Sequence, residues 1–266
     1  MKQRLIFLHI EKTAGTTFRT ILRFQYFRKR IYRIIWNSED FLREKRVVRE
    51  KTHLLQGHML FGMHNHLPTP AAYITFLRDP IERIISAYFY SRRLKERHFD
   101  FHKSHKSSWI QEFSDFCLND QSCFIDNYQT RLLSGLWPRF GECSNDILDA
   151  ACENIDHHFA AVGITEMFDE SLLLFRESLG WFYPPFYITQ NVSPGRLRKT
   201  DLPETLKSHL ETFNQFDLRL YEEFRRKLIE KVQDPGFSKK VQRFRSMNKA
   251  LQLPLKTMLL IYRKFR

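Results

Sequence analysis

The chain opens on a continuous apolar run, and a loop of small residues and then a helical pattern follow it at once. The run is Leu5–Ile10, the loop is Glu11–Thr17, and apolar residues recur at three- and four-residue steps from Phe18 to Tyr26. An uninterrupted apolar run is typical of a strand that is buried on both faces of a parallel sheet. The opening therefore predicts a strand, a loop and a helix that belong to an α/β fold.

A second segment repeats this order with a sharper helix start. Ala72–Leu77 predicts another buried strand, and the sequence Arg78-Asp-Pro-Ile-Glu82 follows it. Asp79 is suited to be the N-cap, Pro80 the first helical residue, and Glu82 the acid of a capping box. We expect a helix that begins immediately after the strand.

The rest of the chain continues the alternation. Phe159–Ile164 predicts a third strand, Phe168–Leu179 and Pro203–Val232 predict helices, and Phe27–Lys51 reads as exposed helix and connector. Strands that alternate with helices indicate a sheet covered by helices on both faces. We expect a P-loop-like three-layer α/β fold with a central, mainly parallel sheet, formed by residues 1–233.

Residues 234–266 form a basic C-terminal tail. From Pro235 to the end there are nine Lys or Arg and no Asp or Glu, and these nine account for most of the net charge of +13. The stretch Met247–Arg266 combines leucines with cations, and such a stretch can lie on an anionic membrane, pack on the domain or remain solvated. These alternatives stay open, and Pro254 is expected to break a single long helix.

Composition excludes several classes of protein. With 15% aromatic residues and only nine glycines, the chain is neither disordered nor collagen-like. It contains no apolar run of about 18 residues that would span a membrane, and no signal peptide. Its four cysteines are too few for a disulfide scaffold, so we expect free thiols. The expected location is the cytoplasm, with peripheral membrane contact through the tail, unless the chain is a fragment of a longer protein.

The first loop has the chemistry of a phosphate cradle. A buried strand ends, small residues allow a tight turn, and a helix begins with its free amide groups pointing outward. A nucleoside-triphosphate loop needs its Lys after the second Gly, whereas here the Lys precedes a single Gly, so that motif does not match. An ordinary strand–helix turn is the alternative. The residues expected to hold an anion are Lys12, Thr13, Ala14, Gly15, Thr16 and Thr17.

A second candidate anion site follows the Ala72–Leu77 strand. Arg78 lies at the carboxyl end of that strand, where open α/β sheets bind ligands. Ser86 is eight residues further on, about two turns along the helix, so its hydroxyl can share a phosphate with Arg78. The alternative for Arg78 is a structural ion pair with a carboxylate.

Together the two motifs resemble the sulfotransferases that use 3′-phosphoadenosine 5′-phosphosulfate (PAPS). His9-Ile-Glu-Lys-Thr-Ala-Gly-Thr-Thr17 is similar to their 5′-phosphosulfate loop, and Leu77-Arg-Asp-Pro-Ile-Glu-Arg-Ile-Ile-Ser86 to their 3′-phosphate motif. The resemblance is greatest to the heparan sulfate 2-O- and 6-O-sulfotransferase branch and covers most of residues 4–230. Three stretches continue it more weakly: Asn127–Arg131, Val162–Glu166 and Asp217–Tyr221.

The resemblance implies a role for each matched position. Residues 12–17 would hold the 5′-phosphosulfate, with Lys12 stabilising charge on the departing phosphate oxygen. Arg78 and Ser86 would hold the 3′-phosphate. The basic loop that contains Arg196, Arg198 and Lys199 is expected from its charge to close over the nucleotide.

Transfer to a hydroxyl also needs a base, and His suits this near neutral pH. The resemblance selects His58, which follows Gly57 and precedes the Ala72–Leu77 strand. His64 and His66 are the alternative candidates for the base. His9 is expected to be packed or hydrogen-bonded. The 2-O branch has a His where this chain has Gln56, and this departure puts uronic-acid specificity in doubt.

The sequence thus predicts a PAPS-dependent sulfotransferase that moves a sulfuryl group to a hydroxyl of a carbohydrate or glycoconjugate. The predicted mechanism is in-line displacement with His58 as general base and no metal. The alternatives are a nucleotide-dependent kinase on a related P-loop fold and a basic nucleic-acid-binding protein. We expect no nucleic-acid partner, because the positive charge sits mainly in the tail.

Overall fold

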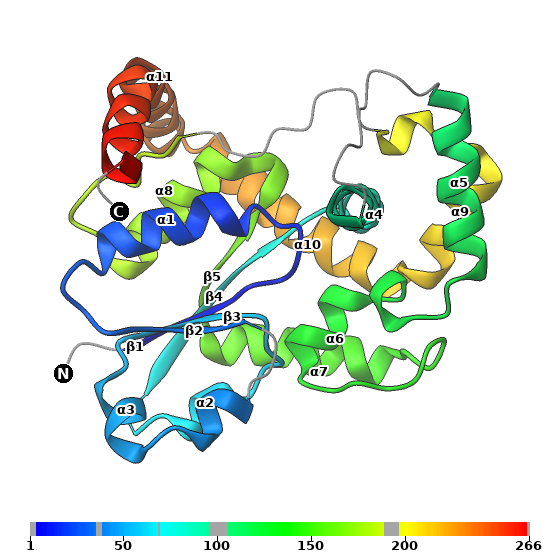
Figure 1. The fold of residues 1–266 in the computed structure, drawn as a ribbon, viewed down its shortest axis with the longest axis horizontal. Helices are drawn as coiled ribbons and strands as arrows, with labels where there is room; N and C mark the ends of the chain where they lie inside the picture. The colour runs from blue at the N-terminus through cyan, green and yellow to red at the C-terminus, as the bar shows by residue number, and fades with distance from the viewer. Residues whose placement is uncertain (1–3, 36–38, 69, 96–105, 189–196, 265–266) are drawn as a thin grey trace.

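A sheet of five parallel strands forms the centre of the molecule. The computed structural model describes residues 4–35, 39–68, 70–95, 106–188 and 197–264. Within these residues the strand order is β2-β3-β1-β4-β5 (Figure 1). The strands are β1 (Arg4–Leu8), β2 (Ile31–Ile34), β3 (Leu54–Gly57), β4 (Ala71–Leu77) and β5 (Phe159–Ile164).

Helices cover both faces of this sheet. One apolar cluster joins the sheet to α1, α8 and α11, and another joins its opposite face to α2, α6, α7 and α10. The predicted three-layer α/β fold with a parallel sheet is therefore confirmed. The helices are α1 (Gly15–Gln25), α2 (Glu39–Arg43), α3 (Arg46–Lys51), α4 (Pro80–Lys95), α5 (Lys106–Asn119), α6 (Tyr128–Ser134), α7 (Asn145–His158), α8 (Phe168–Leu179), α9 (Glu204–Phe213), α10 (Gln215–Gln233) and α11 (Pro235–Lys264), with short 3-10 turns at Met63–His66, Cys123–Ile125, Thr165–Met167 and Lys199–Asp201.

The apolar runs of the sequence explain the central strands. In β1, Leu5 and Phe7 pack toward α1, whereas Ile6 and Leu8 pack toward α7 and α10. Successive side chains of a strand point to opposite faces, so a strand between two helical layers must be apolar at every position.

Helix α4 begins where the sequence predicts. The Asp79 Oδ1 atom accepts hydrogen bonds from the backbone N–H groups of Ile81 (2.9 Å) and Glu82 (3.0 Å), which makes Asp79 the N-cap. The Glu82 carboxylate instead accepts a hydrogen bond from the backbone N–H of Lys199 at 2.8 Å. A third apolar cluster packs α4 against α5 and α9 and fixes its direction.

Two expectations about secondary structure, those for Phe27–Lys51 and Pro254, are wrong, whereas Pro203–Val232 is helical as expected but is divided once. Phe27–Lys51 contains the edge strand β2 as well as α2 and α3. Only one of the four residues of β2 is buried, so its apolar pattern is weak. The segment Pro203–Val232 is two helices that meet at Asn214, and α11 continues through Pro254. Pro254 is exposed, and solvent can bond the carbonyl that a proline leaves without a partner.

The basic tail begins as part of the packed molecule. Phe237, Val241 and Phe244 of α11 are buried in the cluster that includes α1 and α8. Side chains from Leu255 onward lie outside the described residues. In the part of the chain that is described, no helix has the length and apolar character to cross a membrane. The four cysteines are free thiols, as expected.

Candidate active site

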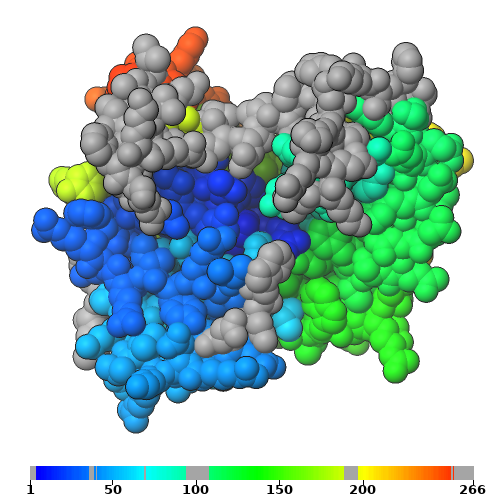
Figure 2. Space-filling model, in the orientation of Figure 1, coloured from blue at the N-terminus to red at the C-terminus, as the bar shows by residue number. Residues whose placement is uncertain are grey.

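The residues that the sequence selects lie at the carboxyl ends of three neighbouring strands. The loop of residues 9–14 follows β1, His58 follows β3, and Arg78 follows β4. All strands run in the same direction, so these ends meet at one edge of the sheet. In Figure 2 blue amino-terminal segments lie beside green segments, and the darkest blue atoms are visible where the two meet.

The loop after β1 has a constrained backbone. Lys12 and Ala14 both have positive φ, 68° and 60°, which is uncommon for residues other than glycine. The Thr13 hydroxyl donates a hydrogen bond to the carbonyl of Ile10 at 2.7 Å, and this side chain is fully buried. Thr13 therefore holds the turn through its side chain. Strain of this kind persists only where surrounding structure enforces it, and it is often found at ligand sites.

The loop delivers the chain to the amino end of α1. The N-cap is Ala14, and no side chain caps this end of the helix. Its first backbone N–H groups are therefore available to an anion. Gly15 is required by packing, because a Cβ atom there would lie 1.7 Å from Nε2 of His9. Of the two threonines that follow, Thr16 is exposed and Thr17 is buried.

His9 is a packed residue, as expected. Its ring lies between Phe7, at 5.3 Å between centroids, and His58, at 4.5 Å. Burial is the main reason that its pKa lies well below 6.5, so the ring is neutral near pH 7.

His58 is held through its Nδ1 atom. Nδ1 lies 3.0 Å from the carbonyl oxygen of His9, and a carbonyl only accepts, so Nδ1 carries the proton and Nε2 keeps its lone pair. Burial lowers the pKa of His58, while the nearby Glu11 carboxylate, 3.9 Å from Nδ1, opposes that shift. Gly57 brings the chain to this position with φ of 149°, and a Cβ atom there would lie 2.0 Å from the carbonyl oxygen of Ile34. The arrangement leaves Nε2 suited to accept a proton.

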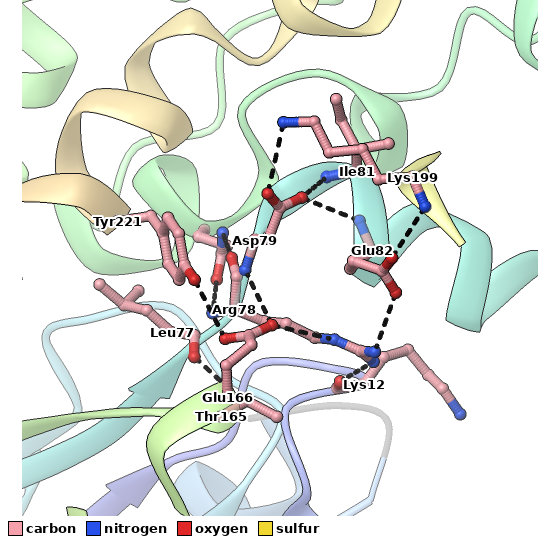
Figure 3. A network of polar contacts seen from close by, with 11 residues as sticks. Lys12, Leu77, Arg78, Asp79, Ile81, Glu82, Thr165, Glu166, Lys199 and Tyr221 are labelled. Atoms are coloured by element: carbon pink, nitrogen blue, oxygen red, sulfur yellow. Dashed lines mark hydrogen bonds and ion pairs between the residues drawn. The ribbon is translucent and has the colours of Figure 1, made fainter. Parts of the chain in front are cut away.

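Arg78 ties β4 to the loop. Its Nη1 atom donates a hydrogen bond to the carbonyl of Lys12 at 2.9 Å. Carboxylates of Glu82 and Glu166 lie 3.6 Å and 3.7 Å from its guanidinium, so the ion pairing that the sequence left open is present (Figure 3). Burial raises the pKa of Glu166, although Arg78 opposes that shift.

Gln129 and Asp217 complete the support of Arg78, and sequence reasoning assigned neither of them a role. The amide of Gln129 accepts a hydrogen bond from the backbone N–H of Arg78 (3.0 Å) and donates one to its carbonyl (2.9 Å). Asp217 caps α6 by accepting from the backbone N–H groups of Gln129 (3.0 Å) and Thr130 (2.7 Å). Asn127 in turn caps α10 through the N–H groups of residues 216 and 217. The two helices thus fix each other at their amino ends.

Tyr221 and Thr165 act on the other side of Arg78. The Tyr221 hydroxyl lies 3.3 Å from Glu166, and the Thr165 hydroxyl donates to the carbonyl of Leu77 at 2.9 Å (Figure 3). The three stretches of weaker resemblance, 127–131, 162–166 and 217–221, therefore converge on Arg78. The weak resemblance of these stretches is the one sequence signal that could have identified the residues that support Arg78.

One face of α4 looks toward the loop. The Lys12 Nζ atom lies 3.7 Å from the ring centroid of Tyr90, and Glu82 contacts Arg78. Ser86 lies on α4 one turn after Glu82 and one turn before Tyr90, so the three share one face of the helix. Ser86 is half-buried. The structure thus brings Ser86 to the side of α4 that faces Lys12 and Arg78.

One residue of the basic loop, Lys199, lies at the amino end of α4. Lys199 lies near Asp79 (3.4 Å) and Glu211 (3.2 Å). These carboxylates raise its pKa against the opposing effect of burial. Arg198 is exposed, and its backbone N–H donates to Asp201. Arg196 lies outside the described residues.

His64 and His66, the alternative candidates for the base, lie away from this site. His64 contacts Tyr73, near the start of β4, through a 2.9 Å hydrogen bond from its backbone N–H to the hydroxyl, and its ring lies 4.5 Å from that of His158. His66 is exposed beside it on the same 3-10 turn. Both belong to the amino end of the sheet, opposite Arg78. In the described ranges, no three His, Cys, Asp or Glu side chains are grouped as metal ligands.

Comparison with known proteins finds similarity to sulfotransferases. A family model described as galactose-3-O-sulfotransferase matches residues 1–256. Mouse galactose-3-O-sulfotransferase 3 is 25% identical over 65% of this chain and 41% of its own length. Human uronyl 2-sulfotransferase is 31% identical over 42% of this chain and 29% of its own length. A sulfotransferase structure from Alicyclobacillus acidocaldarius aligns with 84% of this chain and 96% of that one, at 14% identity and a TM-score of 0.44.

The match to the curated relatives spans less than half of their length. The predicted resemblance to carbohydrate sulfotransferases is confirmed, although the family model names galactose 3-O-transfer rather than the heparan sulfate branch. The parallel sheet, the loop after β1 and the family match over nearly the whole length lead to one assignment: the chain belongs to the galactose-3-O-sulfotransferase family.

Proposed function

We propose that this protein transfers a sulfuryl group from PAPS to a hydroxyl of a carbohydrate or glycoconjugate. One observation carries the proposal: an uncapped helix end, a fixed arginine and a histidine with a free Nε2 meet at one edge of the sheet. Sulfuryl transfer needs an anion cradle, a cation near the leaving group and a base. Family membership makes sulfuryl transfer the reaction that fits these parts.

The residues around the loop fit the anionic half of PAPS. The strained loop and the uncapped amino end of α1 offer backbone N–H groups to the 5′-phosphosulfate. Lys12 would stabilise the charge that develops on the departing phosphate oxygen. Arg78 and Ser86 would hold the 3′-phosphate, with the segment around Arg198 closing nearby. Thr13 would contribute its backbone rather than its hydroxyl, because that hydroxyl donates to Ile10.

His58 would act as the base. As the acceptor oxygen attacks sulfur, Nε2 of His58 takes the hydroxyl proton, and the bond from sulfur to the bridging oxygen breaks. The carbonyl of His9 holds the opposite ring nitrogen, and Glu11 stabilises the imidazolium that forms. Because the pKa of His58 is lowered, the ring is neutral before the reaction at pH 7.

The names of the family and of its relatives suggest the chemical class of the acceptor. The family model and the mouse relative both name galactose, so a galactose hydroxyl is the first acceptor to test. The acceptor would approach from the β3 side of the loop, where His58 lies. Peripheral membrane contact through residues 234–266 and a cytoplasmic location remain predictions.

Calorimetric titration with adenosine 3′,5′-bisphosphate tests the nucleotide half of this proposal. We expect micromolar or tighter binding without metal, and Arg78→Gln should weaken it about tenfold or more, because the lost contact is a charge-assisted one to phosphate. Arg226→Gln is the matched control, since Arg226 lies on the surface of α10 and pairs there with Glu230. Binding of ADP with Mg²⁺ in place of the bisphosphate would support the kinase alternative and contradict the proposal.

A further inference from the structure

An arginine on the edge strand stands beside the candidate base. Arg33 is in register with Gln56, and Gln56 with Phe7, whose side chain packs toward α1. Residues paired in neighbouring strands point to the same face, so Arg33 also projects toward the α1 side of the sheet. The next pair in register is Ile34 and Gly57, directly before His58. Arg33 therefore lies at the end of the sheet that holds His58.

Two more arginines approach this place from α1. Arg19 and Arg23 are four residues apart and so share one side of the helix. Arg23 and Arg33 are exposed, whereas Arg19 is half-buried. Burial and the charges of Arg33 and Arg23 lower the pKa of Arg19, which is consistent with their proximity. We call Arg19, Arg23 and Arg33 the arginine cluster.

The arginine cluster lacks protein partners. Within the described residues, none of the three guanidiniums makes an ion pair or a hydrogen bond. The carboxylate of Glu11 lies 3.9 Å from Nδ1 of His58, and within the described residues it makes no ion pair with these arginines. Three like charges held together repel, and a half-buried guanidinium without an acceptor carries a desolvation cost. Both costs are removed when an anion binds between them.

The strand order separates this cluster from the Arg78 side. The sequence β2-β3-β1-β4-β5 places Arg78 on one side of the central loop and Arg33 on the other, beyond His58. The charges of Arg19 and Arg33 lower the pKa of both His9 and His58, so they lie close enough to affect the candidate base. An anion at the cluster would therefore be near the hydroxyl that His58 deprotonates and apart from the 3′-phosphate.

We propose that the arginine cluster is a subsite for an anionic group of the acceptor. The acceptor would then be an acidic glycan, with a carboxylate or a sulfate ester on a sugar next to the one that is sulfated. This inference rests on the proposed function, because it takes His58 to mark the acceptor side. Guanidinium groups suit both anions, since they bind carboxylate and sulfate oxygens in a bidentate manner.

Three matched oligosaccharides distinguish the anion and its source. The first is a chondroitin hexasaccharide, which carries only carboxylates, and the second is its carboxyl-reduced, uncharged form. The third is a sulfated keratan oligosaccharide of similar length, which carries only sulfate esters. Each is titrated by calorimetry into the full chain saturated with adenosine 3′,5′-bisphosphate. We expect one or both anionic probes to bind about tenfold or more tightly than the neutral one.

The double variant Arg19→Gln, Arg33→Gln tests the assignment. It should remove most of the advantage of the anionic probes and leave the affinity for the neutral probe and for the bisphosphate unchanged. Arg43→Gln is the control, because Arg43 lies on α2, on the opposite face of the sheet, and pairs with Glu39 at 2.9 Å. This control should keep the full preference.

Three outcomes would overturn the inference. Equal binding of charged and neutral probes would show that no anion subsite exists, and an equal loss in Arg43→Gln would show a general effect of net charge. A loss of bisphosphate affinity in the double variant would assign the cluster to the nucleotide and also contradict the inference. Failure of the unaltered protein to bind the bisphosphate would instead contradict the proposed function, so the two failures are distinguishable.

Discussion

The two sides of the candidate site are held in different ways. On the Arg78 side, hydrogen bonds from Gln129 fix the backbone of the arginine, and carboxylates flank its guanidinium. On the His58 side, one carbonyl orients the ring, and the neighbouring arginine cluster makes no ion pair within the described residues. One side is thus a network of hydrogen bonds and ion pairs, whereas the other holds guanidiniums that make no ion pair within the described residues.

This difference suits a site with one constant and one variable ligand. A side chain held by several hydrogen bonds and ion pairs keeps one geometry, which fits a co-substrate that never changes. Charges without protein partners are stabilised only when a ligand supplies the counter-charge, so they favour particular acceptors. Substitutions on the two sides should therefore fail in different ways.

The largest effect is expected from His58→Ala. Loss of a general base slows the chemical step by about 10²- to 10⁴-fold, because nothing else at this position takes the hydroxyl proton. Transfer of labelled sulfate from PAPS to a galactose-terminated acceptor measures kcat. Titration with adenosine 3′,5′-bisphosphate should show unchanged affinity, since the Arg78 side is intact.

His64→Ala is the matched control for this prediction. His64 lies at the amino end of the sheet, where it contacts Tyr73, and its replacement should leave kcat unchanged. An active His58→Ala enzyme together with an inactive His64→Ala enzyme would mean that the base has been placed at the wrong end of the sheet.

A smaller effect on transfer, with a clear effect on stability, is expected from Gln129→Met. This change leaves the backbone N–H and C=O of Arg78 without their partners in a buried site, which should lower the free energy of unfolding by about 2–4 kcal/mol. The affinity for the bisphosphate should fall as Arg78 loses its fixed position. Urea denaturation and calorimetry measure the two quantities.

Gln111→Met controls for the loss of an amide side chain. Gln111 is exposed on α5 and donates a hydrogen bond to Asp115 one turn away, so both quantities should stay near those of the unaltered protein. If Gln129→Met is destabilised but binds the bisphosphate normally, the network supports the fold without positioning Arg78.

Much of the fold follows from local sequence signals. The strands β1, β4 and β5 are nearly continuous apolar runs, because both their faces are covered. The pattern of β2 is obscured by its exposed Arg33, and β3 has only four residues. The break at Asn214 depends on bonds to the carbonyl of Ile125 and to Leu210, the first of them 89 residues away, so no local pattern reveals it.

The candidate site likewise contains residues that local motifs identify and residues that only the folded chain brings together. Lys12, His58 and Arg78 stand in motifs whose spacing is local, and the sequence selects them. Gln129 contacts Arg78 across 51 residues, and Asp217 contacts Gln129 across 88 residues, and both contacts exist only in the folded chain. The arginine cluster has the same origin, because its members come from α1 and β2 and meet through strand pairing.

The smallest effect is a pair of opposite shifts in the pH dependence of kcat/KM. The lowered pKa of His58 places the acid limb of the profile below pH 6.5, because activity falls only when the base is protonated. Glu11→Gln removes a carboxylate that raises this pKa, so the limb should move by a fraction of a pH unit to lower pH. Arg33→Gln removes a cation that lowers it, so the limb should move by a similar amount to higher pH. Arg43→Gln should leave the limb in place, and shifts of the same sign in Glu11→Gln and Arg33→Gln would show that His58 is not the titrating group.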